Sequence, residues 1–259
     1  MGIVNLTPDS FSGDGVGDDV KAAISHAEAQ AQAGADILDL GAESSRPGAA
    51  PVSADVEIAR LRPVLRALRD WGVPISVDTT KPEVMRMALD EGAVLINDIM
   101  ALRAPGALEV LAESDAGVCL MHMQGEPRTM QADPRYGDVV EEVHTFLTAR
   151  LMACLAAGID KARLIVDAGF GFGKTVEHNY TLLRELDRFT TLGVPILVGL
   201  SRKSMLGAVT GREAGSARMP ASIAAALLAV ERGASIVRVH DVAATKDALA
   251  VWAALKGSP

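Results

Sequence analysis

Three polar side chains, each at the end of a short apolar segment, are of types that can bind a small heterocycle. Asp78, Asn97 and Asp167 offer two carboxylates and one amide. An Asp can accept two parallel N–H bonds from a guanidine-like edge, which is the reverse of an Arg–carboxylate pair. The three residues therefore predict a site for a planar, nitrogen-rich ring.

A second group of side chains, close to the C-terminus, carries donors for an anion. Lys203 ends the apolar segment 196–203, and Arg238 and His240 lie within the segment 236–240. Arg238 and His240 are two residues apart, so on one strand they share a face. If the segments belong to a (β/α)8 barrel, these donors lie where barrels frequently bind phosphate. With the acceptor residues, they predict a heterocycle that carries a phosphate or diphosphate.

The elements that must position these residues alternate along the whole chain. Short apolar segments are separated by longer segments of helical period. The short segments are 3–5, 37–40, 75–78, 95–98, 118–122, 164–169, 196–203 and 236–240. Repeats of strand and then helix predict a parallel sheet with right-handed crossovers. Eight of them in 259 residues predict one domain, a (β/α)8 barrel over residues 1–259.

Polar residues recur at the end of each predicted strand, where barrel enzymes carry their active sites. They are Asn5, Asp39, Asp78, Asn97 with Asp98, His122, Asp167, Ser201 to Lys203, and Arg238 with His240. Helix capping explains any single one of them about as well as function does. A complete set on one rim is hard to obtain by capping alone, so we interpret the rim as an active site. His122, between two methionines, is more easily read as structural.

The composition excludes several classes of partner. A net charge of -8 and an aromatic content of 3% argue against a nucleic-acid groove. No apolar stretch approaches the roughly 20 residues of a membrane span, and no secretory signal is visible, so we expect a cytoplasmic protein that does not insert into membranes. Cys119 and Cys154 lie in apolar segments without ligand spacing, which predicts two buried thiols.

Several longer motifs carry a resemblance to a known family. NLTPDSFS, LGAESSRPGA, SVDTTKP, INDI, MHMQG, DAGFGFGKT, GLSRKS and RVHD occur in this order. In order and spacing the chain is similar to the dihydropteroate synthase family of pterin-binding enzymes, from Met1 to about Lys256. The resemblance implies a transferase of folate synthesis that condenses 6-hydroxymethyl-7,8-dihydropterin diphosphate with p-aminobenzoate. It also implies Mg2+ as a cofactor and a homodimer.

The resemblance implies a role for each matching residue. The implied pterin-binding residues are Asp78, Asn97, Met121, Asp167, Phe172 and Lys203. The implied diphosphate-binding residues are Asn5, Arg238 and His240, with Asn5 also facing Mg2+. The implied p-aminobenzoate-binding residues are Phe11, Ser45, Arg46, Pro47 and Ser204. Of these, Asp167, Lys203 and Arg238 are the residues we expect to carry catalysis.

Three departures from the family pattern leave alternatives open. The first loop has SFSGDG where the family has SFSDGG, Ala168 replaces a proline, and GAESS replaces GGEST. A non-catalytic pterin-binding homologue is therefore one alternative. A pterin-dependent methyltransferase is another, although it has no use for a diphosphate site. The DAGFGFGKT motif lacks the first glycine of a nucleotide-binding P-loop, so we do not interpret it as one.

Overall fold

The chain forms a closed parallel barrel in the computed structural model, which describes residues 1–7, 19–44 and 50–257. The strands are β1 (Gly2–Asn5), β2 (Leu38–Gly41), β3 (Ile75–Asp78), β4 (Leu95–Asp98), β5 (Gly117–Met121), β6 (Leu164–Asp167), β7 (Leu197–Val198) and β8 (Ile236–Val237). Strands β1 to β6 pair in sequence order, and β7 pairs with β8. Single bridges from Val166 to Ile196 and from Gly2 to Val239 close the ring. The predicted (β/α)8 barrel is confirmed.

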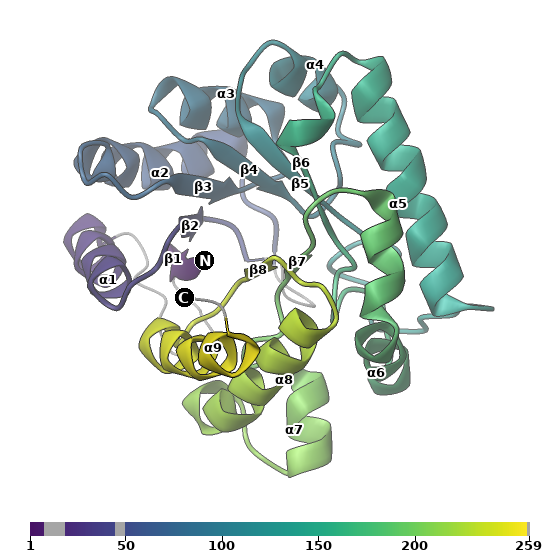
Figure 1. Cartoon of the computed structure of the whole chain (residues 1–259). Helices are drawn as coiled ribbons and strands as arrows, with labels where there is room; N and C mark the ends of the chain where they lie inside the picture. Colours follow the sequence, from purple (N-terminus) through teal and green to yellow (C-terminus); the bar gives the residue numbers. More distant parts are fainter. Residues whose placement is uncertain (8–18, 45–49, 258–259) are drawn as a thin grey trace.

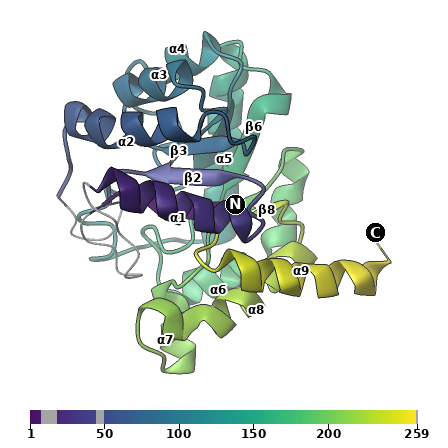
Figure 2. The same ribbon diagram turned by 90° about the vertical axis from the view of Figure 1, so that its left-hand side faces the viewer.

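Helices surround the strands on the outside of the ring (Figure 1). They are α1 (Val20–Gln32), α2 (Ala54–Leu68), α3 (Pro82–Asp90), α4 (Ala107–Ala112), α5 (Val139–Ala156), α6 (Val176–Arg184), α7 (Ser204–Thr210), α8 (Met219–Glu231) and α9 (Val242–Lys256). Short 3-10 helices occupy Lys161–Arg163, Leu186–Leu192 and Gly215–Arg218. The turned view shows α1, α2 and α9 lying roughly alongside the strands (Figure 2). No helix in the described part of the chain is long and apolar enough to span a bilayer.

Local sequence signals set the helix ends. The Asp19 carboxylate accepts hydrogen bonds from the backbone N–H groups of Lys21 and Ala22, which caps the start of α1. Gly34 follows the end of α1 with a φ of 90°, and Gly233 follows α8 with a φ of 96°. Glycine adopts this left-handed conformation without a Cβ penalty. The turns that precede β2 and β8 are therefore structural.

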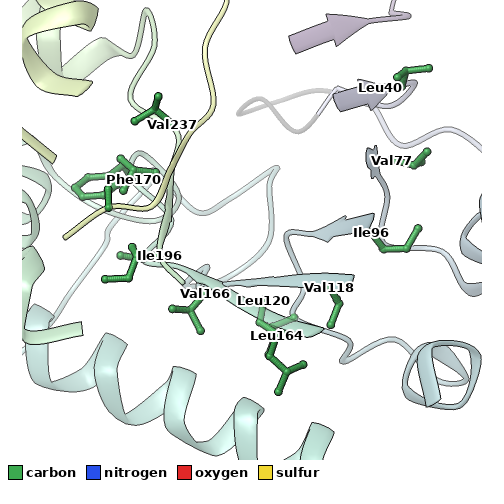
Figure 3. Packing of buried hydrophobic residues seen from close by; sticks show 14 of the residues in the cluster. Leu40, Val77, Ile96, Val118, Leu120, Leu164, Val166, Phe170, Ile196 and Val237 are labelled. Carbon is green, nitrogen blue, oxygen red and sulfur yellow. The ribbon is translucent and has the colours of Figure 1, made fainter. Parts of the chain in front are cut away.

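The core follows the period of two along each strand. Leu40, Val77, Ile96, Val166 and Val237 belong to one large cluster between strands and helices, which Figure 3 shows from close by. The alternate residues face the barrel interior, where one apolar layer consists of Met1, Leu95, Cys119 and Leu197 with Ile37, Ile165 and Ile236 packed against it. Polar residues follow two positions later on most of these strands. The interior therefore changes from apolar to polar toward the carboxyl ends.

Three details of the predicted rim are wrong. Arg238 and His240 do not lie on a strand, because β8 ends at Val237. The other two concern the second and seventh strands. Asp39 does not end its strand, because β2 continues to Gly41 and places the Asp39 side chain one layer deeper in the barrel. The seventh strand ends at Val198, so Ser201 to Lys203 lie in the turn before α7 and not on a strand. Cys119 and Cys154 are buried free thiols, as expected.

Candidate functional site

A cavity of about 530 Å³ opens at the carboxyl ends of the strands. Every predicted site residue in the described part of the chain lines it: Asn5, Asp78, Asn97, Met121, Asp167, Phe172, Lys203, Ser204, Arg238 and His240. The other predicted residues, Phe11, Ser45, Arg46 and Pro47, lie outside the described residues. Asp98, included in the predicted rim, is not part of the lining. Its side chain instead accepts hydrogen bonds from the backbone N–H groups of Met100 and Leu102, both at 2.7 Å.

Arg238 connects two carboxylates at the base of the cavity. Its Nε donates to Oδ2 of Asp39 at 2.6 Å, and an Nη group donates to Oδ2 of Asp78 at 3.0 Å. Asn97 is close to the same Asp39 oxygen, with Nδ2 at 3.4 Å. The Asp39 side chain is fully buried, whereas those of Asp78 and Arg238 are partly accessible. Asp39 therefore anchors Arg238 from below, a role that the sequence did not assign.

The charges of this group depend on each other. Burial raises the pKa of Asp78 to about 7, although Arg238 opposes the shift. Burial also works against the charge of Arg238, but Asp39 and Asp78 outweigh it and raise the pKa of the guanidinium above its usual range. Arg238 is therefore a permanent cation, while Asp78 can gain a proton near neutral pH.

Asp167 and Lys203 face the cavity from its opposite side. One carboxylate oxygen of Asp167, which lines the cavity, accepts from the backbone N–H of Gly169 at 2.7 Å. The Lys203 ammonium donates to the carbonyl oxygen of Phe170 and lies 4.9 Å from the centre of the Phe172 ring. Burial lowers the pKa of Lys203 to about 8, with Asp167 acting in the opposite direction. The pair offers an acceptor, a donor and an aromatic surface to one ligand.

The turn that presents Lys203 and Ser204 is held in an uncommon conformation. Arg202 has a φ of 59°, which non-glycine residues rarely adopt. Its guanidinium forms a two-point contact with Asp241, at 3.0 and 2.6 Å. Its backbone N–H donates to the Ser222 hydroxyl at 2.8 Å. The SRKS and RVHD motifs are thus joined by an ion pair that the sequence analysis did not identify.

His240 and Asn5 complete the rim. The Nδ1 of His240 lies 2.9 Å from the Ser201 hydroxyl, and its backbone N–H donates to the same oxygen at 3.2 Å. Asn5 is the last residue of β1, and its half-buried side chain lines the cavity. Asn5 lies at the end of its strand, as predicted, whereas His240 lies three residues after the end of β8 and not on the strand.

A network of three charged residues borders the cavity beside β3. Lys81 forms salt bridges with Glu43, which lines the cavity, and with the fully buried Glu57 of α2 at 2.7 Å. Glu43 also accepts from the backbone N–H of Val52 at 3.3 Å. These contacts connect the end of β2, the start of α2 and the turn after β3.

The geometry as a whole defines a binding site for a ring with several N–H donors and an attached anion. Acceptors lie at the base and on one side, an aromatic wall adjoins Lys203, and Arg238 and His240 reach the same space. In open and closed parallel α/β folds, ligands bind at the carboxyl ends of strands. The site therefore belongs to a (β/α)8 enzyme that binds a small molecule.

Comparisons with known proteins agree with this class. The family model described as "Pterin binding enzyme" matches residues 1–240. The dihydropteroate synthase of Neisseria meningitidis serogroup C is 54% identical over 259 residues, covering 98% of this chain and 92% of the relative.

Solved structures are equally similar. A Xanthomonas albilineans dihydropteroate synthase with 4-aminobenzoic acid has 53% identity and a TM-score of 0.93, with 100% of this chain and 93% of that chain covered. The same organism's enzyme in complex with 7,8-dihydropteroate has 48% identity and a TM-score of 0.89, with the same coverage. The chain therefore belongs to the pterin binding enzyme family and, within it, to the dihydropteroate synthases, which are transferases of folate biosynthesis.

Proposed function

We propose that the cavity joins 6-hydroxymethyl-7,8-dihydropterin diphosphate to p-aminobenzoate and releases 7,8-dihydropteroate and diphosphate. The observation that carries the proposal is the meeting of Asp78, Asn97 and Asp167 with Lys203 and Arg238 around one cavity. Relatives with about half of their residues identical to this chain bind 4-aminobenzoic acid and 7,8-dihydropteroate. These two molecules are the second substrate and the product of the proposed reaction.

In this proposal the pterin ring lies between the acceptors and the aromatic wall. Asp167 accepts from the amino-pyrimidine edge, and Asp78 and Asn97 bind the remaining polar atoms. Phe172 and Met121 cover the ring faces, and Lys203 donates to a ring oxygen or nitrogen. The N–H groups of the pterin would donate to the carboxylate and amide oxygens. These contacts would favour binding, because buried acceptors without partners are costly.

The diphosphate would lie toward Arg238, His240 and Asn5. Mg2+ is a proposed cofactor, and the donor set is suitable for it. Mg2+ prefers oxygen ligands, keeps several waters, and is usually held by one or two protein groups together with substrate phosphates. Asn5 offers one amide oxygen at the rim, and the described residues include no group of three or more His, Cys, Asp or Glu that could hold a metal. Asn5 would hold the ion jointly with the diphosphate, where it supplies charge neutralisation of the leaving group.

The second substrate would lie nearer the solvent. Ser204, which follows Lys203 at the start of α7, is the described residue that we assign to the p-aminobenzoate carboxylate. Phe11, Ser45, Arg46 and Pro47 are proposed to complete that site. Each of the four comes from the resemblance and lies outside the described residues.

The proposed chemistry requires few catalytic groups. The bond between the pterin methylene carbon and the diphosphate oxygen breaks, and the diphosphate leaves with the electron pair. The neutral arylamine nitrogen then bonds to the methylene carbon and releases one proton to the solvent. Arg238 stabilises the charge that develops on the leaving group, and Asp167 and Lys203 orient the ring. No strong general base is needed, because an arylamine is already neutral at pH 7.

We also propose that the enzyme is cytoplasmic and works as a homodimer. Both proposals rest mainly on the family resemblance. Leu228 of α8 and Val251 and Leu255 of α9 are exposed apolar residues on neighbouring helices, which is compatible with coverage by a second copy. Light scattering of the purified protein measures the oligomeric state.

The decisive experiment is a diphosphate-release assay with p-aminobenzoate as acceptor. The proposal predicts release of diphosphate together with formation of 7,8-dihydropteroate. A methyltransferase or a non-catalytic pterin-binding homologue would release none.

A matched pair of variants tests the site. Asp167→Asn should lose roughly 2–4 kcal/mol of pterin binding, or about 30-fold to 1000-fold in affinity, because a charge-assisted acceptor is lost. Asp98→Asn alters a carboxylate at the same rim that faces away from the cavity, so it should lower stability and leave affinity unchanged. Calorimetry with the pterin measures both, and equal affinities for the two variants would remove Asp167 from the site.

A further inference from the structure

Lys174 is a buried lysine whose hydrogen-bond partners are not carboxylates, although the charge of Asp167 acts on it. Its residue exposure is 3%. The Nζ lies 2.9 Å from the carbonyl oxygen of Gly169, 3.0 Å from that of Phe172 and 2.9 Å from Nδ1 of His122. Burying an amine in this way is costly unless its hydrogen bonds are satisfied. A fourth and longer contact of 3.4 Å joins Nζ to the carbonyl oxygen of His122, so acceptors surround the amine. Burial lowers the pKa of Lys174 well below its ordinary value.

His122 is suited to act as one of these acceptors. Burial, together with the charge of Lys174, lowers the pKa of His122 to about 2, so the ring stays neutral. A neutral imidazole has one nitrogen that accepts and one that donates. The Phe146 ring packs edge-on against His122, with centroids 4.9 Å apart, and fixes the ring in place. His122 follows β5 directly and does not line the cavity.

The loop from Ala168 to Thr175, between β6 and α6, packs tightly against the chain that follows β5. Gly169 and Gly173 have φ values of 68° and 61°. A Cβ at Gly169 would overlap the carbonyl oxygen of His122, and one at Gly173 would overlap that of Gln124. Lys174 lies at this junction and joins the two segments.

The same loop presents groups to the cavity. Phe172 lines the cavity, and the Phe170 carbonyl accepts from the Lys203 ammonium. The Lys203 ammonium also lies over the Phe172 ring. The Phe172 ring and the Phe170 carbonyl both lie between Gly169 and Lys174. The contact from Lys174 to the Gly169 carbonyl joins the two ends of this segment. A shift of the loop would therefore move the aromatic wall and the acceptor of Lys203 at once.

We propose that Lys174, with His122 as its acceptor, is a positioning residue of the pterin site. It fixes the loop that places Phe172 and, through the Phe170 carbonyl, the Lys203 ammonium. This inference rests on the proposed function, because the ligand whose binding it improves is the pterin. Lys174 does not touch the ligand, and its effect passes through the loop.

The test compares two side chains that donate to backbone carbonyl groups at opposite ends of the barrel. Lys174→Met keeps the length of the side chain and removes its donors. Arg163→Met removes the bonds from Arg163 to the carbonyl oxygens of Ala116 and Leu111, at the amino end of β6. Both variants should be less stable. Only Lys174→Met should weaken the binding of 6-hydroxymethyl-7,8-dihydropterin in calorimetry, by at least about tenfold.

A second pair keeps the test decisive if Lys174→Met does not fold. In His122→Asn the amide oxygen lies close to the position of Nδ1 and can still accept from Lys174, whereas His122→Leu offers no acceptor. His122→Asn should retain most of the pterin affinity that His122→Leu loses. Equal pterin affinities of His122→Asn and His122→Leu would overturn the positioning role of Lys174, as would wild-type pterin affinity in a folded Lys174→Met. Neither result would affect the proposed function. Failure of the wild-type protein to bind the pterin would overturn the proposed function and the inference with it.

Discussion

Replacing Arg238 by methionine should leave two carboxylates without their cation. Arg238 pairs with Asp39 at 2.6 Å and with Asp78 at 3.0 Å, and the Asp39 side chain has no solvent exposure. Removing one partner of a buried ion pair costs about 3–5 kcal/mol, because the remaining charge is uncompensated. Total stability of a domain is typically about 5–15 kcal/mol, so the loss is a large fraction. For a chain of this size it corresponds to a fall in Tm of about 6–20 °C.

The same reasoning predicts a partial rescue. Asp39→Asn in the Arg238→Met background removes the uncompensated buried charge. About 1–3 kcal/mol of the lost free energy of unfolding should therefore return. The Lys246–Asp36 pair is a suitable control, because both side chains are exposed. Lys246→Met should cost no more than about 1 kcal/mol. Urea denaturation of the ligand-free proteins measures all of these values. Strictly additive effects of the Arg238 and Asp39 substitutions would refute the idea that Asp39 anchors Arg238.

The remaining predictions concern the loop after β6 and the response to pH. Gly169→Ala should prevent folding or lower stability by several kcal/mol, since the new Cβ would overlap the His122 carbonyl. Gly158→Ala, at a φ of 88° with open space around it, should cost only about 1 kcal/mol, and a similar loss for both in thermal denaturation would contradict the argument. Because the pKa of Asp78 is raised to about 7 in the folded state, that state binds more protons than the unfolded chain between about pH 4 and 7. The contribution of Asp78 to stability should therefore decrease as the pH rises through this window, and Asp78→Asn should remove that slope in urea titrations; an unchanged slope would show that another group causes it.

The sequence predicted the fold because the barrel uses signals that repeat along the chain. Alternation along β4 shows how far this reasoning extends. Asn97 and Asp98 were both placed on the rim, yet only Asn97 shares the inward parity of Leu95. Applying the period of two strictly would have separated them without a structure. Asp98 instead stabilises the turn that follows the strand.

Other features depended on contacts that no local pattern records. Asp39 and Arg238 are 199 residues apart, and their pairing follows from how the ring closes between β8 and β1. Arg202 and Asp241 likewise meet only after β7 and β8 pair. The sequence could indicate which residue types reach the rim, but the depth of each side chain depends on the register of neighbouring strands. Arg202 and Lys174 therefore lay in recognised motifs, and Asp39 among the predicted rim residues, without the contacts that define their roles.

The arrangement around Arg238 explains how one residue can serve both halves of the proposed substrate. A guanidinium has five N–H donors in a rigid plane. Within the described part of the chain, one donates to Asp39 and one to Asp78, which leaves three for other acceptors. The hydrogen bond to Asp39 fixes the plane of the Arg238 guanidinium. The hydrogen bond to Asp78 links the guanidinium to a residue that we propose to bind the pterin. An anionic group on the ligand would then meet a cation already oriented by its carboxylates, so a chain with a net charge of -8 can hold a diphosphate without a basic surface.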